Sequence, residues 1–168
     1  TRIPQCMPAV LLNGSFEGPY SSGLSTNWIS YQRPPNPTTL WSVQTNLPPA
    51  GGGAQYQQIA NTSSGGGGGV RQDITGCTIG ATYTISGWMM LEGAGSGGDT
   101  IKATVKQKDS RDGNDHYFTV KQTTGYNGTW ILVSGSFTLN VVGTLQSLYL
   151  YFEGPASGVV YYLDDANV

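Results

Sequence analysis

Three aromatic or acidic side chains near the end of the chain share one face of an expected strand. Residues 148–153 read Leu-Tyr-Leu-Tyr-Phe-Glu, and side chains alternate between the two faces of a strand. The apolar side chains therefore face a core, while Tyr149, Tyr151 and Glu153 share the opposite face. Aromatic rings stack on the apolar C–H face of a sugar, and a carboxylate accepts hydrogen bonds from its hydroxyl groups. This face indicates carbohydrate binding; the alternative is that each tyrosine is a half-buried structural residue.

The sequence carries no recognisable catalytic motif. The glycine run Gly65–Gly69 is followed by Val-Arg, not by the Lys-Ser/Thr of a phosphate-binding loop, and no Gly-x-Ser-x-Gly elbow occurs. His116 is the only histidine, and no motif places it beside a nucleophile and an acid. A glycosidase needs two carboxylates facing one cleft, for which Glu92 and Glu153 are the candidates. We therefore predict a domain that is not an enzyme, and a small glycosidase is the third-ranked alternative.

A calcium site is predicted where the two ends of the chain meet. The segment Asn-Gly-Ser-Phe-Glu-Gly supplies Glu17, and the closing residues supply Asp164 and Asp165. The two ends of a jelly roll are often adjacent, so hard oxygen ligands from both could hold a structural Ca²⁺ with help from backbone carbonyls. The alternative is that these carboxylates cap turns or face solvent.

The charged run Lys108–His116 is predicted to be a hairpin and not a calcium loop. Arg111 stands where the third position of an EF-hand loop needs a ligand. The pair Asp112-Gly113 is typical of a tight turn between two strands.

Composition excludes several classes of partner. The chain has 168 residues, enough for one domain over residues 1–168 with a sizeable core. Its formal net charge is −2 and 11% of its residues are charged, which gives no electrostatic reason to bind nucleic acid or an anionic membrane. No segment approaches the roughly 20 apolar residues of a membrane-spanning helix.

The two cysteines, Cys6 and Cys77, fit neither a zinc pattern nor a Cys-x-x-Cys redox motif. A disulfide between them is the natural interpretation, and it would indicate an oxidising compartment and thus a secreted protein. The alternative is two buried thiols.

Short alternating or β-branched segments predict an all-β fold. Glycine-rich turns are expected between them, one of them at Gly65–Gly69. No segment shows a 3.6-residue apolar period with helix caps. Many short strands with such turns are typical of an antiparallel β-sandwich, most simply a jelly roll. The expected strands are 40–44, 55–60, 70–74, 81–91, 100–108, 116–121, 129–139, 145–153 and 159–163.

Several segments together resemble the carbohydrate-binding modules of family 22, within the wider group of families 4, 9 and 16. They are NGSFEG, GVRQDITG, YTISGW, GTWILVSGSFTL and LYLYFEGPASGVVYYLDDANV, and the resemblance is strongest from Val70 to Val168. Family 22 modules are xylan-binding jelly rolls appended to xylanases. The resemblance implies that Tyr151 stacks on a xylose ring and that Glu153 accepts hydrogen bonds from sugar hydroxyls.

Further roles follow from the same resemblance. It implies that Tyr117 is another aromatic residue of the cleft and that Trp88 is a platform like one in family 4. It also implies that Glu17 and Asp164 are the ligands of a structural Ca²⁺. Two features depart from the family: Gly65–Gly69 occupies the place of a cleft tryptophan, and the arginine expected soon after Asn27-Trp28 has Arg33 as its nearest candidate.

We therefore expect a non-catalytic module that binds a β-linked plant polysaccharide, with xylan preferred and mixed-linkage β-glucan next. Its partners would be that polysaccharide and an appended glycoside hydrolase. The second-ranked alternative is a structural or adhesion domain of a secreted protein that does not bind sugar.

Overall fold

The computed structural model describes residues 11–32, 39–61, 68–155 and 158–168, which form twelve β-strands and no helix. The strands are β1 (Tyr20–Ser21), β2 (Leu24–Ser25), β3 (Ile29–Gln32), β4 (Thr39–Gln44), β5 (Tyr56–Asn61), β6 (Gly68–Asp73), β7 (Thr82–Glu92), β8 (Asp99–Asp109), β9 (Asp115–Gly125), β10 (Ile131–Thr138), β11 (Leu145–Glu153) and β12 (Val160–Asn167). No helix long and apolar enough to cross a membrane occurs among these residues.

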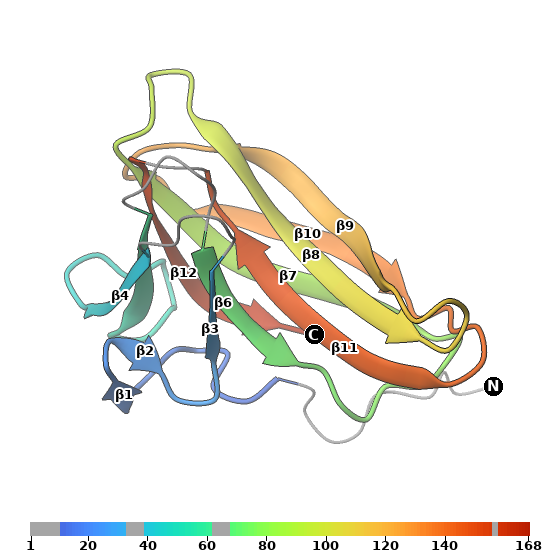
Figure 1. Ribbon diagram of the computed structural model, residues 1–168. Coiled ribbons are helices and arrows are strands. Elements are labelled where there is room, and N and C mark those ends of the chain that lie inside the picture. The colour runs from blue at the N-terminus through green and yellow to red at the C-terminus, as the bar shows by residue number, and fades with distance from the viewer. Residues whose placement is uncertain (1–10, 33–38, 62–67, 156–157) are drawn as a thin grey trace.

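Two five-stranded antiparallel sheets lie face to face (Figure 1). The front sheet has the strand order β3-β6-β11-β8-β9, and the rear sheet has the order β10-β7-β12-β5-β4. The strands β1 and β2 form a separate two-stranded ribbon. The predicted antiparallel β-sandwich is therefore confirmed.

The core lies between the two sheets and follows the alternation of the long strands. On β11, Leu148, Leu150 and Phe152 are buried, as the sequence pattern predicts. The inward side chains of β8 are equally buried, and β7 contributes its own inward set. Side chains that are completely buried include Ile59, Ile85, Met89, Leu91, Ile101, Val105, Val133, Leu150, Phe152, Tyr161 and Leu163.

The glycines at 68 and 69 belong to a strand, not to the turn that the glycine run predicts. They open β6, and a methyl group at Gly69 would come 2.5 Å from the Tyr161 hydroxyl and 2.8 Å from the ring of Tyr31. Tyr161 also donates hydrogen bonds to the carbonyls of Gly68 (3.0 Å) and Phe152 (3.2 Å). Glycine is therefore needed here because backbone and rings approach closely. The rest of the run, residues 65–67, lies outside the described residues.

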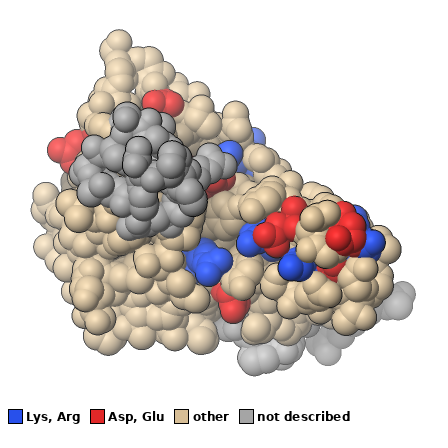
Figure 2. Space-filling model, viewed as in Figure 1, with Lys and Arg blue, Asp and Glu red and all other residues tan. Residues whose placement is uncertain are grey.

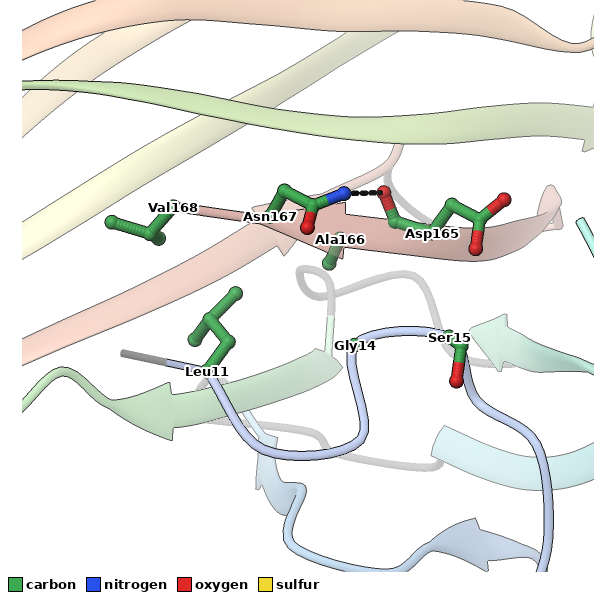
Figure 3. Close-up of a pocket in the computed structure, with 7 residues that line it drawn as sticks. All are labelled: Leu11, Gly14, Ser15, Asp165, Ala166, Asn167 and Val168. Carbon is green, nitrogen blue, oxygen red and sulfur yellow. Dashed lines mark hydrogen bonds between the residues drawn. The ribbon is translucent and has the colours of Figure 1, made fainter. Parts of the chain in front are cut away.

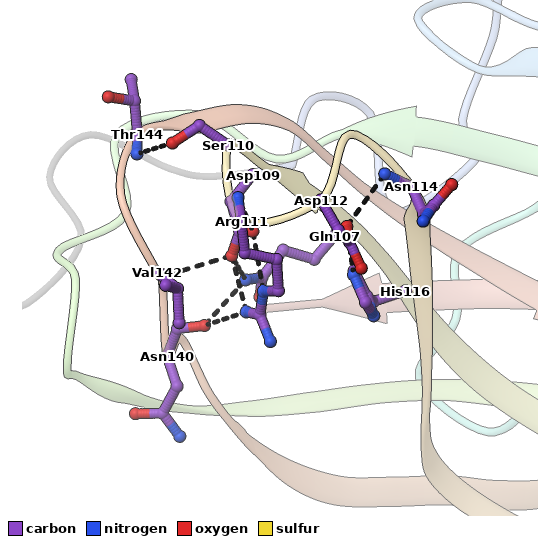
Figure 4. A network of polar contacts seen from close by, with 10 residues as sticks. All are labelled: Gln107, Asp109, Ser110, Arg111, Asp112, Asn114, His116, Asn140, Val142 and Thr144. Atoms are coloured by element: carbon purple, nitrogen blue, oxygen red, sulfur yellow. Dashed lines mark hydrogen bonds and ion pairs between the residues drawn. The ribbon is translucent and has the colours of Figure 1, made fainter.

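An ion pair between the buried Asp109 and the exposed Arg111 fixes the turn between β8 and β9 (Figure 4). The carboxylate of Asp109 accepts hydrogen bonds from Arg111 Nε (2.7 Å) and Nη2 (2.6 Å), and from the backbone N–H of Val142 (3.0 Å). These bonds hold the pKa of Asp109 well below its usual range. His116 contacts Asp112 at 3.0 Å in the same turn. The run is thus the predicted hairpin, and it is tied to the turn before β11.

The first described segment lies against the last strand, as expected for the two ends of a jelly roll. The N–H of Ala166 donates to the carbonyl of Gly14 at 2.8 Å. A pocket of about 180 Å³ beside this contact is lined by Leu11, Gly14 and Ser15 and by the last residues of the chain, 165–168 (Figure 3). This contact brings Glu17 and Asp164 to the same end of the molecule.

Candidate functional site

Nine side chains of the front sheet form a mixed aromatic and polar surface, which we call the tyrosine face. They alternate with the core residues of their strands and so point away from the rear sheet. Figure 2 looks onto this side; charged side chains are sparse, and the largest group lies where β8 turns into β9. The tyrosine face consists of Tyr31, Arg71, Lys102, Thr104, Lys106, Tyr117, Tyr149, Tyr151 and Glu153.

Tyr151 lies at the centre of the tyrosine face and packs against Tyr31. It pairs with Arg71 on β6 and Thr104 on β8. The ring centroids of Tyr31 and Tyr151 are 5.2 Å apart, with the planes inclined at 56°. Because Tyr151 is only 7% exposed and Tyr31 is half-buried, Tyr31 presents the larger part of this pair to a ligand. The sequence analysis missed Tyr31.

Glu153 is held in place by two neighbours on β8. Its Oε2 accepts a hydrogen bond from the Thr104 hydroxyl (2.8 Å) and lies 3.3 Å from Lys102 Nζ. Its side chain is partly exposed. A carboxylate fixed by a hydroxyl and an ammonium group is positioned to accept further hydrogen bonds from a sugar.

Tyr149 is flanked by two cations. The guanidinium carbon of Arg71 lies 4.6 Å from the ring centroid of Tyr149, and Lys106 Nζ lies 5.5 Å from it. Both distances lie within the range of cation–π attraction. Tyr149 thus organises the charged side chains beside Tyr151, a role that the sequence pattern did not indicate.

Tyr117 is the most exposed aromatic residue of the tyrosine face. It lies opposite Lys106 on β9, the edge strand of the front sheet, and 61% of its surface is exposed. The structure therefore places four of the predicted sugar-binding residues, Tyr117, Tyr149, Tyr151 and Glu153, on one surface.

Trp88 is separated from these residues, contrary to the role that the resemblance implies. It belongs to β7, where it pairs with Leu132 and Asp164 in the rear sheet. The alternation of β7 correctly puts Trp88 on an outward face, but this face is on the other side of the sandwich. Trp88 is thus not part of the tyrosine face, and Arg33 lies outside the described residues.

The pair of carboxylates considered for a glycosidase is also separated. Glu92 ends β7 in the rear sheet and accepts a hydrogen bond from the Tyr162 hydroxyl, whereas Glu153 ends β11 in the front sheet. Two acids on different sheets with different outward faces do not flank one cleft.

Glu17 and Asp164 converge on the turn formed by Gly52 and Gly53. A methyl group at Gly52 would come 2.8 Å from Asp164 Oδ2, and one at Gly53 would collide with Glu17 Oε1. Glu17 Oε1 accepts hydrogen bonds from the N–H groups of Ala54 (2.6 Å) and Gln55 (2.8 Å).

Of these two acids, Asp164 has fewer hydrogen bonds to its carboxylate. It is completely buried, and its Oδ2 has no hydrogen-bond partner within the described part of the chain. Burial, with the charges of Asp165 and Glu17 adding to it, raises the pKa of Asp164 to about 8. A buried carboxylate oxygen without a partner, next to a second carboxylate, fits a divalent cation.

No cluster of three or more His, Cys, Asp or Glu occurs among residues 11–32, 39–61, 68–155 and 158–168. Any ion at Glu17 and Asp164 would therefore need backbone carbonyls or water to complete its coordination. The proposed disulfide involves Cys6, which lies outside the described residues.

This chain has the features of a sugar-binding β-sandwich module. Its front sheet carries grouped tyrosines and a fixed carboxylate, together with hydroxyl and amine donors. The profile of the family described as Carbohydrate binding domain, CBM_4_9, matches residues 8–158, and the chain belongs to this family. This family match also confirms the prediction of a binding module in place of an enzyme.

Solved structures of family 22 modules share the fold. The CBM22-1 xylan-binding domain of Paenibacillus barcinonensis Xyn10C has a TM-score of 0.68 at 23% identity and covers 91% of this chain and 88% of that one. The CBM22-2 domain of the same protein also has a TM-score of 0.68, at 18% identity, covering 86% of this chain and 92% of that domain. The predicted jelly roll of the family 22 type is thus confirmed.

Two sequence relatives are much longer proteins. Endo-1,4-beta-xylanase A of Thermotoga neapolitana is 36% identical over 90 residues, and that of Thermoanaerobacterium saccharolyticum is 37% identical over 93 residues. Each match covers 53% of this chain and 8% of the relative. The chain thus corresponds to a small part of each xylanase.

Proposed function

We propose that this domain binds a β-linked plant polysaccharide, with xylan as the preferred ligand, along the tyrosine face. The observation that carries the proposal is the Tyr31–Tyr151 pair beside the fixed carboxylate of Glu153. The ring of Tyr31 on β3 and the ring and carboxylate on β11 lie on either side of β6, so groups for the apolar face of a sugar and for its hydroxyls stand close together. Binding between the millimolar and micromolar ranges corresponds to about −4 to −8 kcal/mol.

The relatives support the choice of polysaccharide. Two relatives are named as endo-1,4-beta-xylanases, and two structural neighbours are described as xylan-binding domains. By analogy, this domain would hold an appended glycoside hydrolase close to its insoluble substrate and raise the local substrate concentration. A protein that acts on plant cell walls would also be secreted.

Mixed-linkage β-glucan is the second candidate ligand. The place of the family's cleft tryptophan falls in the run Gly65–Gly69, and the last two of these glycines lie in β6 next to Tyr31. A surface with a smaller aromatic platform has more room for the hydroxymethyl group that glucose carries and xylose lacks.

We also propose that a structural Ca²⁺ binds between Glu17 and Asp164. The partnerless Oδ2 of the buried Asp164 supports this proposal, because an ion would compensate its charge. The ion would join the N-terminal segment, the turn at Gly52–Gly53 and β12. It would lie on the rear-sheet side and should not contact the polysaccharide.

Affinity electrophoresis tests the ligand. The domain would be run through native gels containing xylan, barley β-glucan or no polysaccharide. We expect retardation in xylan. Tyr31→Ala should lower the affinity for xylan about tenfold. Tyr126→Ala, which removes an exposed tyrosine from the turn after β9, should leave the affinity unchanged. Retardation in the β-glucan gel alone would show that the ligand is β-glucan and not xylan. No retardation in either gel would overturn the proposal in favour of a structural or adhesion domain.

A further inference from the structure

The basic side chains of this chain are concentrated on one surface. The described residues include six lysines and arginines, of which four lie on the outward face of the front sheet by the alternation of β6 and β8. These four are Arg71, Lys102, Lys106 and Lys108. The formal net charge of the chain is −2, so this clustering is not a consequence of a basic composition.

Arg71 differs from its basic neighbours because no carboxylate of the described residues pairs with it. Lys102 lies 3.3 Å from Glu153, and Lys106 lies 3.0 Å from Asp115. The ion pairs within the described part of the chain do not include Arg71. Its positive charge is thus uncompensated at the centre of the tyrosine face.

The guanidinium of Arg71 is also held in place. Its carbon lies 4.6 Å from the ring centroid of Tyr149, and its Nε is buried without a hydrogen-bond partner. A buried donor without a partner is costly, and a stacked guanidinium loses little further freedom when it binds. The Arg71 guanidinium is therefore positioned to donate hydrogen bonds to an acceptor on a ligand.

We propose that Arg71 binds the carboxylate of a uronic acid branch on the polysaccharide. A carboxylate accepts two parallel N–H bonds from a guanidinium and neutralises its charge, whereas a sugar hydroxyl does only part of this. The domain then prefers acidic, uronate-substituted xylan to the bare chain. This inference rests on the proposed function, because the branch is carried by the chain that the tyrosines bind.

Asp73 limits the preference for an acidic branch. It follows Arg71 by two residues on β6, lies opposite Tyr149 and is exposed. Together with Ser147 and Tyr149, it lines a hollow of about 270 Å³. Its negative charge repels a carboxylate at Arg71, so Asp73→Asn should increase the preference for the charged ligand.

Calorimetric titration with two matched ligands tests the inference. One is a xylo-oligosaccharide with a glucuronic acid branch, and the other is the same molecule with the carboxyl reduced to an alcohol. At low ionic strength we expect the acidic ligand to bind about fivefold more tightly. The preference should disappear in Arg71→Gln, increase in Asp73→Asn, and decrease as salt is added.

Lys121→Gln is the matched control, because it removes one positive charge from β9 at a position opposite the inward-facing Ala103. It should leave the preference unchanged. Equal affinity of the unmodified domain for both ligands would overturn the inference and leave the proposed function intact. Failure to bind either ligand would overturn the proposed function itself. A preference that survives Arg71→Gln in a folded variant would also overturn the assignment to Arg71.

Discussion

Without the proposed calcium ion, the stability of this domain should decrease as the pH rises, because of Asp164. Its side chain is completely buried, and its only hydrogen bond in the described residues is from the N–H of Asp165 to Oδ1, at 2.8 Å. Burial, reinforced by the charges of Asp165 and Glu17, raises its pKa from 3.8 to about 8. A bound Ca²⁺ would stabilise the ionised form and remove this effect.

The sign and size follow from proton linkage. Because the folded-state pKa is raised, the favourable contribution of Asp164 is complete below about pH 4 and is lost progressively up to about pH 8. The slope is about 1.4 kcal/mol per pH unit, so the total loss is at most roughly 6 kcal/mol. For a domain of this size that is a decrease in Tm on the order of 10–20 °C.

Differential scanning calorimetry at several pH values, with calcium and with a chelator, measures this effect. We expect the decrease in Tm only in the chelated protein. Asp164→Asn should remove both the calcium response and the steep pH dependence, whereas Asp99→Asn, at the exposed start of β8, should keep both. A chelated protein whose Tm varies with pH no more than that of Asp164→Asn would refute the reasoning.

Three further predictions concern the fold and the limits of the site. Asp109→Asn should lower the urea concentration at the midpoint of unfolding, because it leaves Arg111 without its charged partner, and the unmodified protein should lose this contribution as the pH falls below the usual range of an aspartate. Gly69→Ala should lower both Tm and xylan affinity, since the methyl group displaces Tyr31; an unchanged affinity would contradict that contact. Trp88→Ala should leave retardation in xylan gels unchanged; a loss of binding would restore Trp88 to the site.

The strands of this fold could be predicted from sequence wherever both faces of a strand have distinct composition. On β11 the expected bounds, 145–153, match the strand, and the alternation gives the faces of residues 148–153; a register shift between Leu145 and Ser147 breaks the period before them. On β7 the alternation identifies an outward tryptophan but not the sheet to which the strand belongs. That assignment depends on pairing with β10 and β12, which are distant in sequence. The role of Trp88 beside the tyrosines is implied by the family resemblance alone, and the alternation of its strand does not test it.

Short strands and close contacts were the least predictable parts. β3 has four residues, too few for a period to stand out, and Tyr31 becomes a site residue only because Gly69 lies opposite it. In the sequence, Arg71 is one charged residue within an expected strand, and nothing in the pattern indicates a role in binding. Its significance comes from the register, which places it beside Tyr151 and diagonally across from Tyr149.

The tyrosine face keeps the chemical types that the family resemblance implies while placing them on different strands. The resemblance implies an arginine soon after Trp28, near β3, and a tryptophan just before β6. In this chain β3 carries the aromatic Tyr31, and β6 carries Arg71. Ile29 pairs with Arg71, and Tyr31 pairs with Gly69. Because β3 and β6 are neighbours, the exchange preserves one ring and one guanidinium beside Tyr151. We therefore expect the domain to bind its ligand without the tryptophan, with the positive charge meeting a different part of the ligand.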